Sequence, residues 1–214
     1  MITPQDASAR ALEICQLAPI VPVLVVEDAS IAQDLARALV AGGLPALEVT
    51  LRTDAALDVI AEMAKVEGGV VGAGTLLTPA DVEAAVAAGA KFGVSPGATD
   101  TLLDACEAAD LPLLPGAATA SESMRLLERG YSVQKFFPAE ASGGASALKA
   151  IGAPIPQVRF CPTGGVNPKN ANDYLSLPNT ICAGGSWVCP KDLIAARDWA
   201  GITALAKAAS QLAV

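Results

Sequence analysis

The sequence contains no histidine among its 214 residues. Histidine is the side chain that most often serves in acid–base catalysis near neutral pH, and it is the commonest metal ligand in proteins. Without it, proton transfer in any active site of this chain must depend on Glu, Asp, Lys, Tyr or Cys side chains. The same absence disfavours a catalytic metal centre, and we expect no bound metal.

Basic residues and long apolar runs are also scarce. The 14 Lys and Arg residues are outnumbered by 22 Asp and Glu residues, which gives a net charge of −8. We expect no nucleic-acid partner, because binding nucleic acid requires a basic surface. No apolar stretch reaches the roughly 18 residues of a membrane-spanning helix, so we expect no membrane partner. An anionic substrate would have to be attracted by its site rather than by the whole surface.

The five cysteines are odd in number and include no C-x-x-C pair. This usage fits neither a disulfide framework nor a zinc site. The sequence also shows no secretory leader at its start. We therefore expect a cytoplasmic protein whose thiols are reduced.

Short apolar or β-branched segments alternate with Ala- and Leu-rich segments of helical spacing. The predicted strands are residues 19–26, 46–51, 69–74, 91–95, 111–116, 132–137, 157–163 and 179–185. Eight such strand–helix units favour an α/β fold, a single (β/α)8 TIM barrel domain over residues 1–214. The alternative that the same alternation permits is a doubly wound parallel sheet. Residues 3–18 are predicted as an extra N-terminal helix that closes the bottom of the barrel.

Two of the helical segments carry clear signals at their N-terminal ends. Residues 78–90 begin with Thr78, which is followed by a proline. Residues 119–130 begin with Thr119 and carry Glu122 three positions later, the spacing of a capping box. These signals predict where both helices begin.

Polar residues late in the strands indicate where a site would lie, because the active site of a (β/α)8 barrel is at the C-terminal ends of its strands. The second strand places Glu48, Thr50 and Arg52 on one face, since side chains alternate along a strand. The sixth strand carries Lys135 in an apolar segment. Glu48 and Arg52 could instead form a structural ion pair, and Lys135 could extend along the surface to solvent.

Lys135 is followed directly by Phe136 and Phe137, although lysine is almost never fully buried unless its charge is compensated. Apolar surroundings disfavour the charged form of an amine, and a neutral amine adds to a carbonyl to form a Schiff base. The protonated imine then accepts the electrons of an adjacent carbon–carbon bond as it breaks. We predict Lys135 as the imine-forming residue, Glu48 as the proton-transfer group and Arg52 as the cation for a substrate carboxylate.

Glycine-rich turns follow the seventh and eighth predicted strands. They are Thr163-Gly164-Gly165 and Gly184-Gly185-Ser186. In this fold the loops after these two strands commonly bind phosphate through backbone N–H groups. Glycine lets the backbone approach an anion closely, and a hydroxyl adds a donor. The two turns together predict a phosphate-binding site.

The sequence also resembles the family of 2-keto-3-deoxy-6-phosphogluconate (KDPG) aldolases, which also acts on 2-keto-4-hydroxyglutarate (KHG). The motifs that carry the resemblance are LEVTLRT (47–53), GAGT (72–75), SPG (95–97), KFFPAE (135–140), CPTGG (161–165) and GGSW (184–187). They occur in matching order between about residues 19 and 190. KFFPAE together with CPTGG is specific to the family, whereas the short glycine motifs taken singly are not.

The resemblance implies a class I aldolase, a homotrimer without cofactor, that cleaves KDPG to pyruvate and glyceraldehyde 3-phosphate in the Entner–Doudoroff pathway. Lys135 resembles the Schiff-base lysine and Glu48 the proton-transfer carboxylate. The expected substrate contacts are Arg52, Thr75, Pro96, Phe137 and Thr163. The expected phosphate contacts are Gly164, Gly165, Gly184, Gly185 and Ser186.

One departure from the family pattern lies at the end of the first strand. Some relatives carry an arginine there, where this chain has Val25-Val26-Glu27. Three alternatives to the KDPG reaction remain open. In the first the substrate is the galactonate epimer, and in the second it is KHG. In the third the protein is a phosphate-binding barrel without Schiff-base chemistry.

Overall fold

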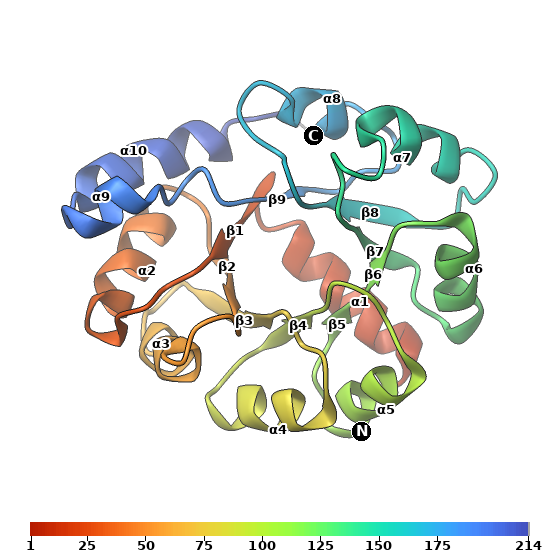
Figure 1. Ribbon diagram of the computed structural model, residues 1–214, viewed down its shortest axis with the longest axis horizontal. Helices are drawn as coiled ribbons and strands as arrows, with labels where there is room; N and C mark the ends of the chain where they lie inside the picture. The colour runs from red at the N-terminus through yellow and green to blue at the C-terminus, as the bar shows by residue number, and fades with distance from the viewer. Residues whose placement is uncertain (214) are drawn as a thin grey trace.

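A computed structural model describes residues 1–213 and forms an α/β fold in which every strand pairs in parallel. The strands surround the centre of Figure 1, helices α2 to α10 lie outside them, and α1 crosses the middle of the view. The strands are β1 (Ile20–Leu24), β2 (Ala46–Thr50), β3 (Val70–Gly74), β4 (Phe92–Val94), β5 (Leu113–Leu114), β6 (Gly116–Ala117), β7 (Val133–Phe136), β8 (Arg159–Pro162) and β9 (Ala183–Gly185). The predicted class, parallel strands alternating with helices, is confirmed.

The helices follow the strands in turn, after one that precedes β1. They are α1 (Pro4–Cys15), the 3-10 helix η1 (Ala29–Ile31), α2 (Ala32–Ala41), α3 (Ala56–Met63), α4 (Pro79–Ala87), α5 (Asp100–Ala108), α6 (Ala120–Arg129), α7 (Gly144–Gly152), α8 (Ala171–Leu175), α9 (Lys191–Ala195) and α10 (Trp199–Ser210). Within residues 1–213 no helix is both long and apolar enough to cross a membrane.

The hydrogen-bonded order divides the strands into two sheets. A six-stranded sheet has the order β5-β4-β3-β2-β1-β9, and a three-stranded sheet has the order β6-β7-β8. The predicted strand 111–116 is therefore two short strands, with Pro115 between them. Proline has no N–H to donate to a ladder, whereas the Pro115 carbonyl still accepts from the Lys135 backbone N–H at 2.8 Å. β5 pairs with β4, and β6 pairs with β7.

The predicted helix starts agree with the structure. Thr78 and Thr119 are the N-caps of α4 and α6, and each forms a complete capping box. The Thr119 backbone N–H donates to the Glu122 carboxylate at 2.9 Å, and the Glu122 N–H donates back to the Thr119 hydroxyl at 3.3 Å. α4 ends at Ala87, three residues before the predicted end at residue 90.

The predicted N-terminal helix is present as α1, and it contacts β5 and β7. The Ser8 hydroxyl accepts hydrogen bonds from the backbone N–H groups of Ser132 and Val133, both at 3.0 Å. These bonds attach α1 to the start of β7. The helix thus covers the N-terminal ends of the strands, opposite to the ends where a site is predicted.

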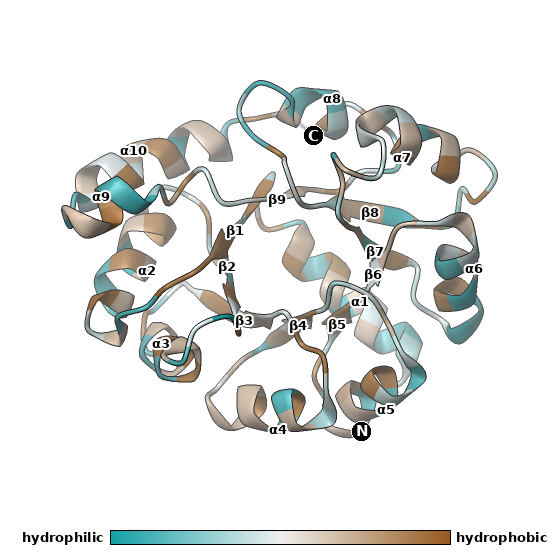
Figure 2. Cartoon of the chain, viewed as in Figure 1, coloured by the Kyte–Doolittle hydropathy of each residue, from teal (hydrophilic) through white to brown (hydrophobic). Residues whose placement is uncertain are grey.

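The apolar core has two parts. The larger part lies between the strands and the surrounding helices and includes Leu35, Leu39 and Ile60. The smaller part, which includes Val21, Phe92 and Cys161, lies between α1 and the strands. Figure 2 shows hydrophobic strands at the centre and hydrophilic residues on the outer helices. Both parts fix the strands, so the side chains at the strand ends are held in place.

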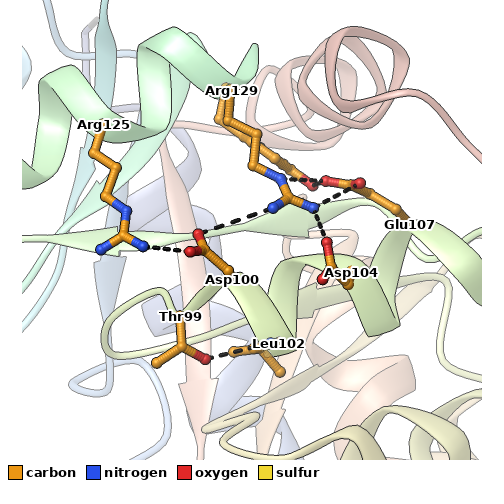
Figure 3. A network of polar contacts seen from close by, with 8 residues as sticks. Thr99, Asp100, Leu102, Asp104, Glu107, Arg125 and Arg129 are labelled. Atoms are coloured by element: carbon orange, nitrogen blue, oxygen red, sulfur yellow. Dashed lines mark hydrogen bonds and ion pairs between the residues drawn. The ribbon is translucent and has the colours of Figure 1, made fainter.

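An ionic cluster links α5 to α6 (Figure 3). Arg125 pairs with Asp100, and Arg129 pairs with Asp104 and with Glu107, the latter at 2.8 Å. Hydrogen bonding to Glu107 is the main reason that the pKa of Arg129 lies above its ordinary value. The cluster is completed by Tyr131, just before β7, whose hydroxyl donates to Glu107 at 3.1 Å.

Candidate active site

A cleft of about 290 Å³ opens at the C-terminal ends of the strands. It is lined by Val23, Glu48, Thr50, Arg52, Thr75, Pro96, Lys135, Phe137, Thr163, Gly164, Gly165, Val166, Gly184, Gly185 and Ser186. Every site residue predicted from the sequence is among them. Val23 and Val166 were not predicted, because an isolated valine in an apolar chain carries no signal of a site. Val25, Val26 and Glu27, where the family pattern departs, do not line this cleft.

Lys135 lies in the middle of β7 with only 5% of its surface exposed. Its Nζ donates to the Oε1 atom of Glu48 at 3.3 Å and lies 5.2 Å from the centre of the Phe137 ring. The neighbouring Phe136 belongs to the core against the helices, where its ring packs edge-on against Phe160. The amine is therefore held from both sides and does not extend to solvent.

Glu48 lies in the centre of β2 and is 3% exposed. Its carboxylate occupies space that Gly74 on β3 leaves free, since a Cβ atom at position 74 would lie 2.4 Å from Oε1. Burial raises the pKa of Glu48 above its ordinary value, and the nearby Lys135 ammonium opposes this shift. A carboxyl group with a raised pKa can both accept and return a proton near neutral pH.

Arg52 follows β2 at the rim of the cleft. Its Nε donates to the Thr50 hydroxyl at 3.2 Å, and Thr50 in turn donates to the Leu24 carbonyl at 2.9 Å. In residues 1–213 no carboxylate pairs with the Arg52 guanidinium. The alternative of a structural Glu48–Arg52 ion pair is therefore wrong, because Lys135 is the partner of Glu48. The remaining guanidinium donors are available to a substrate carboxylate.

Thr75, directly after β3, has a left-handed backbone conformation with φ of 64°. A β-branched residue rarely adopts this conformation because its Cβ is crowded, and such strain is concentrated at functional sites. The turn carries the Thr75 side chain to the cleft. The strain supports the prediction that Thr75 contacts a ligand.

The Gly164–Gly165 turn presents unpaired backbone donors. The carbonyls of residues 163, 164 and 165 each accept a hydrogen bond, from Ala139 N–H at 2.8 Å, from Glu140 N–H at 3.0 Å and from two asparagine side chains. In a trans peptide the following N–H points opposite to the carbonyl. The N–H groups of Gly165 and Val166 thus point away from these partners, and no acceptor in residues 1–213 pairs with them. Such a row of free donors suits an anion.

The second glycine turn lies beside the first. Gly184 and Gly185 are buried in β9, a single bridge pairs Gly184 with Thr163, and Ser186 is exposed at the cleft. The Trp187 ring occupies the space next to Gly185, since a Cβ there would lie 1.8 Å from the ring. Ser186 is therefore the residue of this turn whose side chain can reach a ligand.

Metal ligands are sparse in this structure. Over residues 1–213 no group of three or more Cys, Asp or Glu side chains is placed to hold a metal ion. The five cysteines are free and buried. Cys161 on β8 lies beside Lys135 on β7. Hydrogen bonds from Cys15 and Cys182 lower the pKa of the Cys161 thiol. The thiols of Cys15, Cys161 and Cys182 belong to the smaller part of the apolar core rather than to a metal site.

Residues 12–205 match the family model described as KDPG and KHG aldolase. The chain belongs to the KDPG and KHG aldolase family. The match covers all the strands and the whole cleft, so the family resemblance noted in the sequence motifs is confirmed.

Individual members of the family are similar over nearly their whole length. The 2-dehydro-3-deoxy-phosphogluconate aldolase of Pseudoalteromonas atlantica is 54% identical, with 89% of each chain covered. The KHG/KDPG aldolase of Escherichia coli K12 is 50% identical, with 93% of this chain and 94% of the relative covered. A crystal structure of KDPG aldolase from Legionella pneumophila is 46% identical, with 94% and 98% coverage and a TM-score of 0.90. That structure holds pyruvate captured at low pH as a covalent carbinolamine intermediate.

The sequence patterns did not predict the residues that lie behind the Gly164–Gly165 turn. Four residues contact that turn or one another, yet none of them lines the cleft: Glu140, Asn167, Asn170 and Tyr174. Glu140 ends the KFFPAE motif, but no periodicity or spacing indicates that it reaches a turn 25 positions later.

Proposed function

We propose that the protein is a class I aldolase that cleaves KDPG to pyruvate and glyceraldehyde 3-phosphate. The observation that carries the proposal is the buried Lys135–Glu48 pair, with Nζ and Oε1 at 3.3 Å, in a cleft that also holds the free N–H groups of the Gly164–Gly165 turn. The names of the relatives support it. The test is a coupled assay in which lactate dehydrogenase reduces the released pyruvate. An absence of pyruvate release from KDPG would contradict the proposal.

Lys135 is the nucleophile in this proposal. Its neutral amine adds to the C2 carbonyl of KDPG to form a carbinolamine, which loses water to give a protonated imine. The imine accepts the electron pair of the C3–C4 bond as that bond breaks, and glyceraldehyde 3-phosphate leaves. The enamine that remains takes a proton at C3 and becomes the imine of pyruvate. Water then hydrolyses this imine, which releases pyruvate and the free amine.

Glu48 moves the protons in these steps. It assists the loss of water from the carbinolamine, takes the proton of the C4 hydroxyl during cleavage and returns a proton to C3 of the enamine. The burial that raises its pKa favours both directions of transfer, because a base whose pKa is shifted upward is more readily reprotonated.

The two ends of the substrate are held by different groups. Arg52 binds the carboxylate, and Thr75, Pro96 and Phe137 surround the pyruvate portion. The phosphate binds to the free N–H groups of the Gly164–Gly165 turn, with Thr163 and the Gly184–Ser186 turn beside it. The distance between the two ends then selects the length of the substrate.

KHG is a second candidate substrate, because the relative that is 50% identical carries the name KHG/KDPG aldolase. KHG presents a carboxylate where KDPG has a longer phosphorylated chain. It would use Lys135, Glu48 and Arg52 fully and the phosphate turns little. A panel of KDPG, its galactonate epimer and KHG, compared by kcat/KM, ranks the three.

We further propose that the strands close into a (β/α)8 barrel and that three copies associate. Single bridges pair Phe160 with Thr180 and Thr163 with Gly184, which supports contact between β8 and β9. At the other junction β5 and β6 are separated only by Pro115. Closure would make residues 1–214 one domain.

Light scattering coupled to gel filtration tests the proposed association of three copies. The free thiols favour a cytoplasmic location.

Exhaustive chelation should leave turnover unchanged. Imine chemistry supplies its own electron sink, and the sequence has no histidine to hold a catalytic metal. The measurement is kcat before and after dialysis against EDTA. Loss of activity that a divalent ion restores would contradict a metal-free mechanism.

Ser186→Ala should raise KM for KDPG by about 10- to 100-fold, the effect of losing one hydrogen bond to a charged group. The enzyme should also exchange the methyl protons of pyruvate with deuterated water. The pyruvate concentration that gives half-maximal exchange should change by less than about twofold, since pyruvate has no phosphate. Ser186 is a better test than Gly185, where any side chain displaces Trp187. An equal rise in KM for KDPG and in the half-saturating concentration of pyruvate would mean that Ser186 does not contact the phosphate.

A further inference from the structure

The Gly164–Gly165 turn is supported from behind by four side chains that do not touch the cleft. We call Glu140, Asn167, Asn170 and Tyr174 the loop brace. All four come from segments at the C-terminal ends of β7 and β8, and each contacts the turn or another member of the brace.

The two asparagines of the loop brace fix the last peptide of the turn. Both side-chain amides donate to the Gly165 carbonyl, Asn167 at 3.0 Å and Asn170 at 3.1 Å. The Asn167 backbone N–H donates to the Asn170 side-chain oxygen at 2.7 Å, which orients the Asn170 amide. Because the Gly165 carbonyl is held in this direction, the N–H of Val166 is directed the opposite way.

Glu140 and Tyr174 hold the middle of the turn. The Glu140 side chain lies against Gly165, since a Cβ atom at position 165 would be 2.5 Å from the Glu140 Cγ. The Glu140 carboxylate accepts a hydrogen bond from the hydroxyl of Tyr174, which is fully buried on α8. Burial and this bond raise the pKa of Tyr174. The hydroxyl therefore stays protonated and remains a donor.

The turn needs such support because of its backbone. Gly164 and Gly165 both have left-handed conformations, with φ of 100° and 83°. Glycine can leave such a conformation easily, because it has no Cβ to restrict it. An unsupported turn would populate other arrangements, and a ligand that requires one arrangement binds more weakly in proportion to its population.

We infer that Tyr174 and Glu140 are positioning residues for phosphate recognition, which hold the Gly164–Gly165 turn with its N–H groups directed at the ligand. This inference rests on the proposed function and adds residues that contact no substrate. It predicts that the Tyr174–Glu140 hydrogen bond controls the affinity for the phosphorylated end. The imine chemistry at Lys135 does not depend on it.

Tyr174→Phe removes only the hydroxyl and keeps the buried ring. We expect KM for KDPG to rise about three- to tenfold, with kcat changed by less than about twofold. This is only part of the roughly 10- to 100-fold effect of one lost hydrogen bond to a charged group, because the lost bond acts on the ligand through the turn. The half-saturation of pyruvate in methyl-proton exchange should not change. Glu140→Ala should raise KM for KDPG at least as much as Tyr174→Phe, because it also removes the Cγ atom that lies against Gly165. Glu140→Gln should retain near-wild-type KM, because its amide oxygen still accepts from the Tyr174 hydroxyl.

Tyr131→Phe is the matched control. Tyr131 is also fully buried, and its hydroxyl also donates to a glutamate, Glu107, at 3.1 Å. It lies at the start of β7, at the opposite ends of the strands from the cleft. We expect Tyr131→Phe to lower the Tm about as much as Tyr174→Phe and to leave KM for KDPG unchanged. An equal rise in KM for both variants, or no rise for Tyr174→Phe, would overturn the inference.

Calorimetric titration with glycerol 3-phosphate separates this inference from the proposed reaction, because it requires no turnover. If the wild-type protein binds this ligand and Tyr174→Phe weakens binding by a similar factor, the inference holds even if KDPG is not cleaved. If the wild-type protein does not bind it, or if Tyr174→Phe binds it equally well, the inference is wrong even if KDPG is cleaved.

Discussion

Lys135→Met will abolish aldolase turnover, lowering kcat by roughly 10⁴-fold or more, the scale seen when an enzyme loses its nucleophile. Methionine fills a similar volume and suits the apolar surroundings, but it has no amine to add to the substrate carbonyl. The measurement is pyruvate release from KDPG in the coupled assay. Circular dichroism should show a folded variant, because burial raises the pKa of Glu48 and lets this carboxyl group take a proton when its partner is lost.

The same residue should be labelled by reductive trapping. Borohydride reduces an imine formed with pyruvate to a stable secondary amine, and peptide mass mapping identifies the modified lysine. Among the lysines of residues 1–213 only Lys135 is buried, whereas Lys91 and Lys149 are exposed and lie outside the cleft. We expect the adduct on Lys135 alone. An adduct on Lys91 or Lys149, or none, would contradict its role as nucleophile.

Glu48→Gln should lower kcat by about 10² to 10⁴, the usual contribution of general acid–base catalysis. Glutamine keeps the shape and can still accept the hydrogen bond from Lys135, but it cannot carry a proton. Imine formation with pyruvate should persist, as trapping will show. Exchange of the pyruvate methyl protons with deuterated water should fall by a similar factor, because it needs the same base and no aldehyde.

The pH dependence provides an independent check on Glu48. A base must be ionised to accept a proton, so activity falls as the pH drops below its pKa. Because burial raises the Glu48 pKa, the acidic limb of the wild-type exchange rate should lie above the ordinary value of about 4.5. The residual exchange of Glu48→Gln should lack this limb. Wild-type exchange rates in the variant would instead assign the proton transfer to a bound water or to another carboxylate.

Much of this architecture follows from local patterns in the sequence. The alternation of apolar and helical segments predicted the parallel strands, and the Thr119–Glu122 spacing predicted the start of α6, since both depend on residues close together in the chain. The split at Pro115 could not be read in the same way. A proline within an apolar run is compatible with one interrupted strand or with two, and only the pairing partners distinguish them.

The sequence by itself determined which chemical groups the site contains. Strand parity placed Glu48 on one face with Arg52, and the two glycine turns predicted where an anion would bind. The tertiary structure decided how these groups pair. Glu48 contacts Lys135, 87 positions away, because β2 and β7 face each other across the cleft. The N–H groups of Gly165 and Val166 are free because Glu140 and the asparagines hold the carbonyls of the turn. Both outcomes depend on contacts between distant segments, which no local pattern encodes.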